Sequence, residues 1–175
     1  GNNVFGNGVA AFVLGDEPYL RKLGVAGIVG GALFRNVVLT IDSRRKKITT
    51  SVPYRPSYMK LDHRADISVL SGSVVTFSVA INGTVFPLIF DTWNDGMITL
   101  TPSDFARITG DDGKKVELFN GYGQTMMTGA SKIVAKCDFV KNTFSNVVVA
   151  ENKDLPRSVV GTGILKEGIL SIDFQ

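Results

Sequence analysis

Residues 75–92, VTFSVAINGTVFPLIFDT, decide the fold class. Apolar Val75, Phe77, Val79 and Ile81 alternate with small or polar neighbours, a period of two that is typical of a half-buried strand. The pair at 82–83, Asn-Gly, is the preferred sequence of a two-residue hairpin turn. The apolar run 85–90 then predicts a return strand. We therefore expect a β-hairpin and, beyond it, an all-β protein.

The composition agrees with this expectation. The chain has 175 residues, of which 44% are hydrophobic and 20% charged, so it can bury the core of a globular domain. Its 19 glycines are spread along the chain, as in a protein with many turns.

The single cysteine and the single histidine exclude several kinds of chemistry. An intrachain disulfide needs two cysteines, and zinc sites built from several Cys and His side chains need more such ligands than the two that this chain has. His63 lies in a polar connecting stretch, and Cys137 belongs to an alternating strand pattern that predicts an inert buried thiol. We expect no metal and no cofactor.

The net charge is +3, and the most basic run is 44–47, Arg-Arg-Lys-Lys. Apolar strand patterns flank this run, and no aromatic residues interleave it, so we interpret it as a solvated turn rather than a nucleic-acid site. The chain has no run of 18 apolar residues that would predict a membrane span, and no signal peptide is recognised. The compartment is not readable; secretion or a periplasmic location is left open.

An internal repeat organises the chain. Residues 30–42 align without gaps on residues 161–173, and size or polarity is often kept where the residues differ. We interpret 67–175 as a nearly complete lobe and 1–58 as the C-terminal part of a first, similar lobe, with 59–66 as the linker. The alternative is that two strand–turn units look alike by chance.

Three motifs together resemble the retropepsin-like aspartic proteases, particularly bacterial tandem aspartyl protease-like proteins. They are the strand that runs into Asp91-Thr92, the glycine-bearing hairpin at Gly121-Tyr122-Gly123, and the segment 161–173 that ends in Ile-Asp. The resemblance implies a closed-barrel lobe of the retropepsin and pepsin type, together with the C-terminal part of a second such lobe, as the repeat suggests.

The resemblance also implies a chemistry. Two carboxylates, one from each lobe, share a proton; one activates a water and the other donates to the peptide carbonyl. It assigns Asp91 as a catalytic carboxylate and Thr92 as the hydroxyl that locks the loop. It assigns Gly121, Tyr122 and Gly123 to a flap over a peptide or unfolded protein, with Trp93 and Asn94 beside the substrate.

Two departures from the family pattern bear on activity. Trp93 stands where the family has Gly, and a glycine-only turn there would be distorted by its side chain. The chain also has a single Asp-Thr of this kind, so a second carboxylate must come from a missing segment, a separate polypeptide or a homodimer. Asp95-Gly96 offers another register of the motif, but the apolar strand ends at residue 90, which favours Asp91.

The alternatives to a peptidase are a degenerate peptide-binding domain and a purely structural β-domain.

Overall fold

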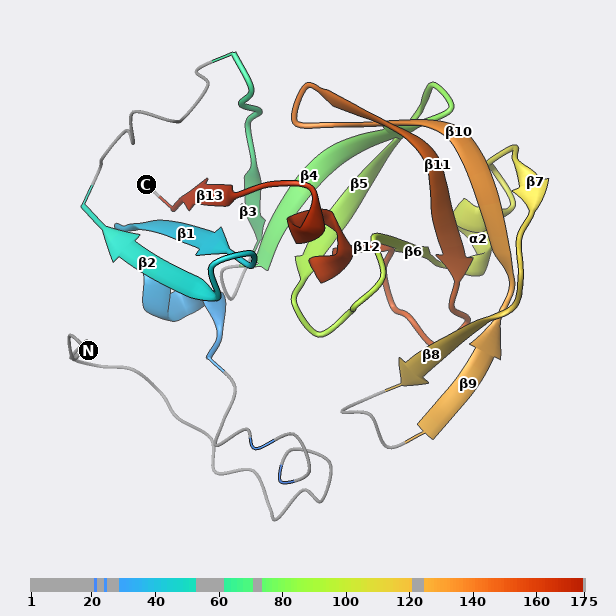
Figure 1. Cartoon of the computed structure of the whole chain (residues 1–175), viewed down its shortest axis with the longest axis horizontal. Helices are drawn as coiled ribbons and strands as arrows, with labels where there is room; N and C mark the ends of the chain where they lie inside the picture. The colour runs from blue at the N-terminus through green and yellow to red at the C-terminus, as the bar shows by residue number, and fades with distance from the viewer. Residues whose placement is uncertain are drawn as a thin grey trace.

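The computed structural model of the chain describes residues 21, 24, 29–52, 62–70, 74–120 and 125–174 (Figure 1). Within these ranges, strands dominate and helices are short. The strands of the largest sheet are β3 (Ser68–Leu70), β4 (Val74–Ile81), β5 (Thr84–Asp91), β6 (Ile98–Leu100), β7 (Asp111–Asp112), β10 (Ser131–Phe139), β11 (Asn142–Glu151) and β12 (Val159–Gly161).

Six of these strands close into a barrel. The order is β4–β5–β12–β6–β11–β10, and pairing of β10 with β4 closes the ring. The two short strands lie beside it: β3 pairs with β4, and β7 pairs with β10. Most neighbours are antiparallel, but β12 runs parallel to β5, and β6 runs parallel to β11. The prediction of an all-β closed barrel is confirmed.

The β4–β5 hairpin forms as its sequence predicts. Asn82 and Gly83 both have positive φ angles, 46° and 86°, as a two-residue turn of this type requires. The Asn82 side chain also fixes its neighbours: Nδ2 donates to the Thr109 carbonyl at 2.7 Å, and Oδ1 accepts from the Lys136 N–H at 2.9 Å. The turn is therefore tied to the rest of the barrel.

The barrel encloses the hydrophobic core. Phe77 packs edge-on against Phe90 and Phe139, with ring centroids 5.9 and 5.2 Å away. Cys137 is buried, as predicted, and burial together with the charge of Asp138 raises the pKa of its thiol to about 12. The side chains with no exposed surface at all include Val79, Ile81, Phe86, Leu88, Leu100, Val134 and Val149.

A smaller sheet lies beside the barrel. It contains β1 (Val38–Asp42), β2 (Lys47–Ser51) and β13 (Leu170–Asp173) in the order β13–β1–β2. The basic run 44–47 forms the turn between β1 and β2 and the start of β2, which confirms its interpretation as a turn. Arg44 Nη2 donates to the Lys166 carbonyl at 3.0 Å, so the turn also contacts the end of η2 (Thr162–Lys166), a 3-10 helix.

The remaining elements are short. They are the 3-10 helix η1 (Gly31–Phe34), the helix α2 (Pro102–Phe105), and the hairpin of β8 (Val116–Asn120) and β9 (Thr125–Gly129). In the described part of the chain, no helix has the length and apolar character needed to cross a membrane. The predicted linker is described from residue 62 onward, where it is irregular.

Candidate functional site

Asp91 is the last residue of β5, so the strand ends where the sequence predicts. It is half-buried and lies opposite Gly161 in the parallel β5–β12 pair. The Trp93 N–H donates to Asp91 Oδ1 at 2.9 Å, and the Asn94 N–H donates to the Asp91 carbonyl at 3.2 Å. These two bonds fold residues 91–94 into a tight turn and orient the carboxylate. Thr92, the predicted locking hydroxyl, is exposed.

Asn94 is the hydrogen-bonding centre of the loop that follows. Its Oδ1 accepts from the Gly96 N–H at 3.0 Å, and its Nδ2 donates to Oγ1 of the fully buried Thr99, also at 3.0 Å. Its backbone carbonyl accepts from the Thr162 N–H at 2.7 Å and from Thr162 Oγ1 at 3.1 Å. The loop is thereby fastened both to β6 and to the start of η2.

Two glycines of η2 and β12 allow this close approach. A Cβ placed on Gly161 would collide with the backbone oxygens of Asn94 and Gly96. A Cβ placed on Gly163 would lie 2.6 Å from the Met97 nitrogen and 2.7 Å from the Gly96 carbonyl carbon. The Gly-Thr-Gly sequence at 161–163 therefore has a structural reason: the loop after Asp91 crosses directly over its backbone.

Trp93 sits in the turn with ordinary backbone geometry. The described non-glycine residues with positive φ are Asn36, Lys46, Asn82, Val140, Lys141 and Asn146, and Trp93 is not among them. The glycine-only geometry considered from the sequence is therefore not used here, and the tryptophan does not strain the turn. Its side chain is 36% exposed.

The predicted flap is a hairpin whose two strands are described. β8 and β9 pair antiparallel, and Asn120↔Thr125 is the pair nearest the tip. Gly121, Tyr122 and Gly123 lie outside the described residues, so their assignment to a flap tip stays a prediction.

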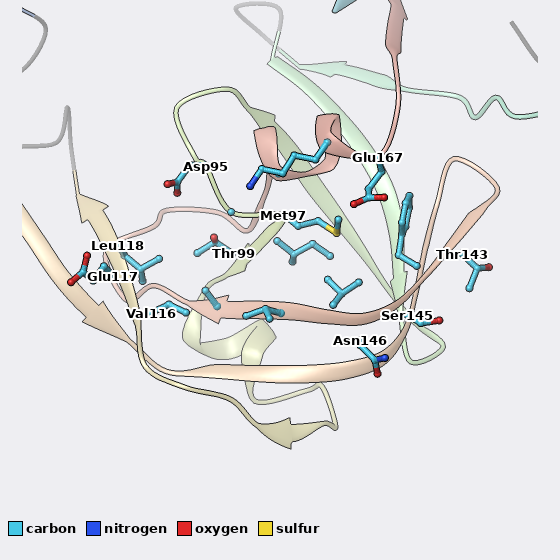
Figure 2. Close-up of a pocket in the computed structure, with 18 residues that line it drawn as sticks. Asp95, Met97, Thr99, Val116, Glu117, Leu118, Thr143, Ser145, Asn146 and Glu167 are labelled. Atoms are coloured by element: carbon cyan, nitrogen blue, oxygen red, sulfur yellow. The ribbon is translucent and has the colours of Figure 1, made fainter. Parts of the chain in front are cut away.

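A cavity of about 670 Å³ opens between β8, β11 and η2 (Figure 2). Met97, Leu118 and Phe144 contribute apolar surface to its lining. Asp95 and Glu117 approach one side of it, and the lining also includes Lys166 and Glu167. Asp91, Thr92, Trp93 and Asn94 are not among its lining residues; the loop enters the cavity only from Asp95 onward.

Sequence reasoning did not identify Glu117, Lys166 or Glu167 as lining residues. Each is a charged residue in or beside a short strand or turn, a position where charge is ordinarily just solvated. The sequence pattern offers Asp95 only as the aspartate of an alternative register of the motif, Asp95-Gly96. Among the residues that the structure describes, no group of three or more His, Cys, Asp or Glu side chains could hold a metal ion.

The barrel defines an all-β protein. Asp91 is the last residue of strand β5, and the loop that follows it crosses over Gly161 and Gly163. No protein-family model matches the chain, and no curated protein matches it. Among solved structures, it is similar to a retropepsin-like aspartic protease from Rickettsia conorii, with 14% sequence identity and a TM-score of 0.45. That similarity covers 61% of this chain and 91% of the other.

Proposed function

We propose that this chain is an aspartic-protease-like barrel in which Asp91 is one carboxylate of a pair that hydrolyses peptide bonds. The observation that carries the proposal is the position of Asp91. It ends a barrel strand, opposite Gly161, and the loop behind it is fastened through Asn94 to Thr99 and Thr162. A carboxylate held in this way is oriented by the backbone rather than by a flexible side-chain partner.

The chemistry needs a second carboxylate. In such a pair, the ionised group takes a proton from water while the water oxygen attacks the peptide carbonyl carbon, and the protonated group donates its proton to the carbonyl oxygen. A single carboxylate cannot be the base and the acid of the same step. We therefore infer that hydrolysis by this chain requires a second carboxylate close to Asp91, brought there by a further segment, a separate polypeptide or a second copy.

The experiment is cleavage of an unfolded protein at acid pH by the chain in its native complex, with new termini detected by mass spectrometry. Asp91→Asn is expected to lower the rate by about 10²–10⁴-fold, the usual contribution of a general acid or base. Asp95→Asn is the matched control, because it removes a carboxylate of the same loop that lines the cavity. Loss of cleavage in Asp95→Asn with full activity in Asp91→Asn would move the catalytic assignment to Asp95.

A second candidate is a lobe that binds extended peptides without cutting them. Trp93 favours it, since a partly exposed tryptophan next to Asp91 offers an aromatic anchor where the family pattern has glycine. Trp93 is the only tryptophan of the chain, so its fluorescence reports directly on this place. Peptide-dependent quenching without any cleavage favours binding alone. Unchanged emission across a broad peptide panel rejects it and leaves a structural β-domain.

A further inference from the structure

The two aligned segments of the chain face each other across the small sheet. The offset of the alignment is 161 − 30 = 131 positions, so Thr40 corresponds to Ser171. In the antiparallel pair of β1 with β13, Thr40 lies directly opposite Ser171, and their hydroxyl oxygens are 2.9 Å apart. On either side, Leu39 faces Ile172 and Ile41 faces Leu170. Corresponding positions are therefore exchanged, as around a local two-fold axis.

Contacts outside the sheet obey the same exchange. Ser43 Oγ, just after β1, donates to the Leu165 carbonyl in η2 at 2.7 Å. With the offset of 131, the corresponding pair is Phe174 and Phe34, whose ring centroids are 6.4 Å apart. Each short helix thus contacts the strand end of the other segment. The two-fold relation extends from the strands to η1 and η2.

The two segments differ in what covers them. Val160, in barrel strand β12, is 1% exposed, whereas its counterpart Val29 is 61% exposed. A Cβ on Gly161 would collide with the loop after Asp91, whereas a Cβ on Gly30 would meet nothing within 4 Å. η2 has three buried residues, and η1 has none. We call Val29, Gly30 and η1 the Gly30 face.

We propose that the Gly30 face docks a strand and turn of a second polypeptide with the pattern of residues 84–95, so that an acidic residue lies opposite Gly30 as Asp91 lies opposite Gly161. The face continues the β1–β13 interface, and the two-fold relation places the counterparts of β5 and its loop on it. The inference rests on the proposed function in one respect: the docked acid is the second carboxylate. The docking itself depends only on the shape and exposure of the Gly30 face and requires no catalysis.

The two faces differ at one further position. Ala32 occupies the place of Gly163 and brings the Cβ that would clash with Gly96 and Met97 in the second segment. The docked turn therefore follows the course of residues 84–95 and diverges from it beyond the counterpart of Asp95. For this reason, the probe for the face ends at that residue.

The test uses Val29→Cys in the full chain as a labelling site. Cys137 is 1% exposed with a thiol pKa of about 12, so a maleimide at neutral pH reacts only with the thiol introduced at position 29. The probe is a synthetic peptide that has three lysines at its N-terminus followed by the sequence of residues 84–95. The control peptide carries the same residues in reversed order. The rate of labelling at position 29 is expected to fall with peptide concentration and to be about tenfold lower at ten times the concentration that occupies half of the chain. Val85→Cys, an exposed site on the barrel, is expected to label at an unchanged rate.

Gly30→Ala separates docking from folding. In the free chain, a Cβ at position 30 meets no atom within 4 Å, and the same holds for a Cβ at position 168. The free energy of unfolding of Gly30→Ala is therefore expected to match that of Gly168→Ala. The same Cβ is expected to abolish protection by the peptide, as it would collide with the counterpart of Asn94. Protection that persists in Gly30→Ala, or equal protection by the reversed peptide, contradicts the proposal.

Two other occupants are distinguished in the same experiment. If the thiol of the Val29→Cys variant is unreactive without peptide, the chain's own residues cover the face. If it is protected as the protein concentration rises and the chain dimerises, a second copy covers the face; either result overturns the proposal. Labelling requires no catalysis. Protection in a chain without peptidase activity would therefore leave the docking intact and reject only the proposed function.

Discussion

Substituting Gly163 by alanine tests whether the crossing of the Asp91 loop over η2 is as tight as the structure has it. The new Cβ would lie 2.6 Å from the Met97 nitrogen, 2.7 Å from the Gly96 carbonyl carbon and 2.9 Å from its oxygen. All three are backbone atoms, which cannot rotate away as a flexible side chain would. The loop or η2 must shift, and the hydrogen bond from the Gly163 N–H to the Gly96 carbonyl, 3.1 Å long, weakens with it.

Overpacking of this kind costs about 3 kcal/mol of unfolding free energy, at the upper end of the usual range because backbone must move. For a chain of this size, that lowers the melting temperature by about 6–12 °C. In urea, it lowers the midpoint by about 1.5 M if the slope is about 2 kcal/mol per molar. Unfolding is followed by the emission of Trp93, which lies in the affected loop.

The control is Gly168→Ala, which introduces the same methyl group after η2 but meets no atom within 4 Å. We expect it to be neutral or to stabilise by up to about 1 kcal/mol, because alanine restricts the unfolded chain. If the two variants unfold within about 0.5 kcal/mol of each other, the spread expected of surface changes, the crossing is looser than described and the argument from Gly161 and Gly163 fails.

Three further predictions concern the loop, the small sheet and the buried thiol. Asn94→Ala is expected to cost about 1–3 kcal/mol, because it removes the side-chain bonds to Thr99 and to the loop backbone; thermal melts measure it. A double-mutant cycle of Thr40→Val and Ser171→Ala is expected to give a coupling of about 1 kcal/mol, and a value near zero would leave their hydroxyl contact without energetic weight. The pKa of Cys137 rises from 9.0 to about 12 on folding, so its contribution to stability is complete below pH 9 and is lost as the pH rises toward 12. Urea midpoints across that range should fall less in Cys137→Ala than in the unchanged chain.

The barrel hairpin could be predicted because its information is local. The alternation of residues 75–81 and the Asn-Gly pair specify two strands and their turn without any reference to the rest of the chain. The basic run 44–47 is similar, since the flanking β-branched residues already identify it as a turn. Closure of the barrel was predicted only through the family resemblance, because the β10–β4 pairing that completes it joins residues more than fifty positions apart.

The cavity could not be predicted for the same reason. Its lining comes from four stretches, 95–99, 116–118, 143–150 and 163–167, which only the tertiary fold brings together. Glu117 stands between two apolar residues of an ordinary strand, and Lys166 and Glu167 lie at the end of a short 3-10 helix. No local pattern distinguishes Glu117 or Lys166 from the many charges that face water alone.

The tryptophan at position 93 shows why a departure from a motif must be judged by the backbone that carries it. In this turn, the glycines that close packing requires are Gly161 and Gly163, on the chain that the loop crosses, and a Cβ at either would meet loop backbone. At position 93, φ is not positive and the side chain is partly exposed, so a bulky residue fits there without strain. The replacement of glycine by Trp93 is therefore no argument that the Asp91 turn is degenerate. The proposed peptidase chemistry depends instead on whether a second carboxylate reaches Asp91, and the open surface at Gly30 is where we expect its strand to dock.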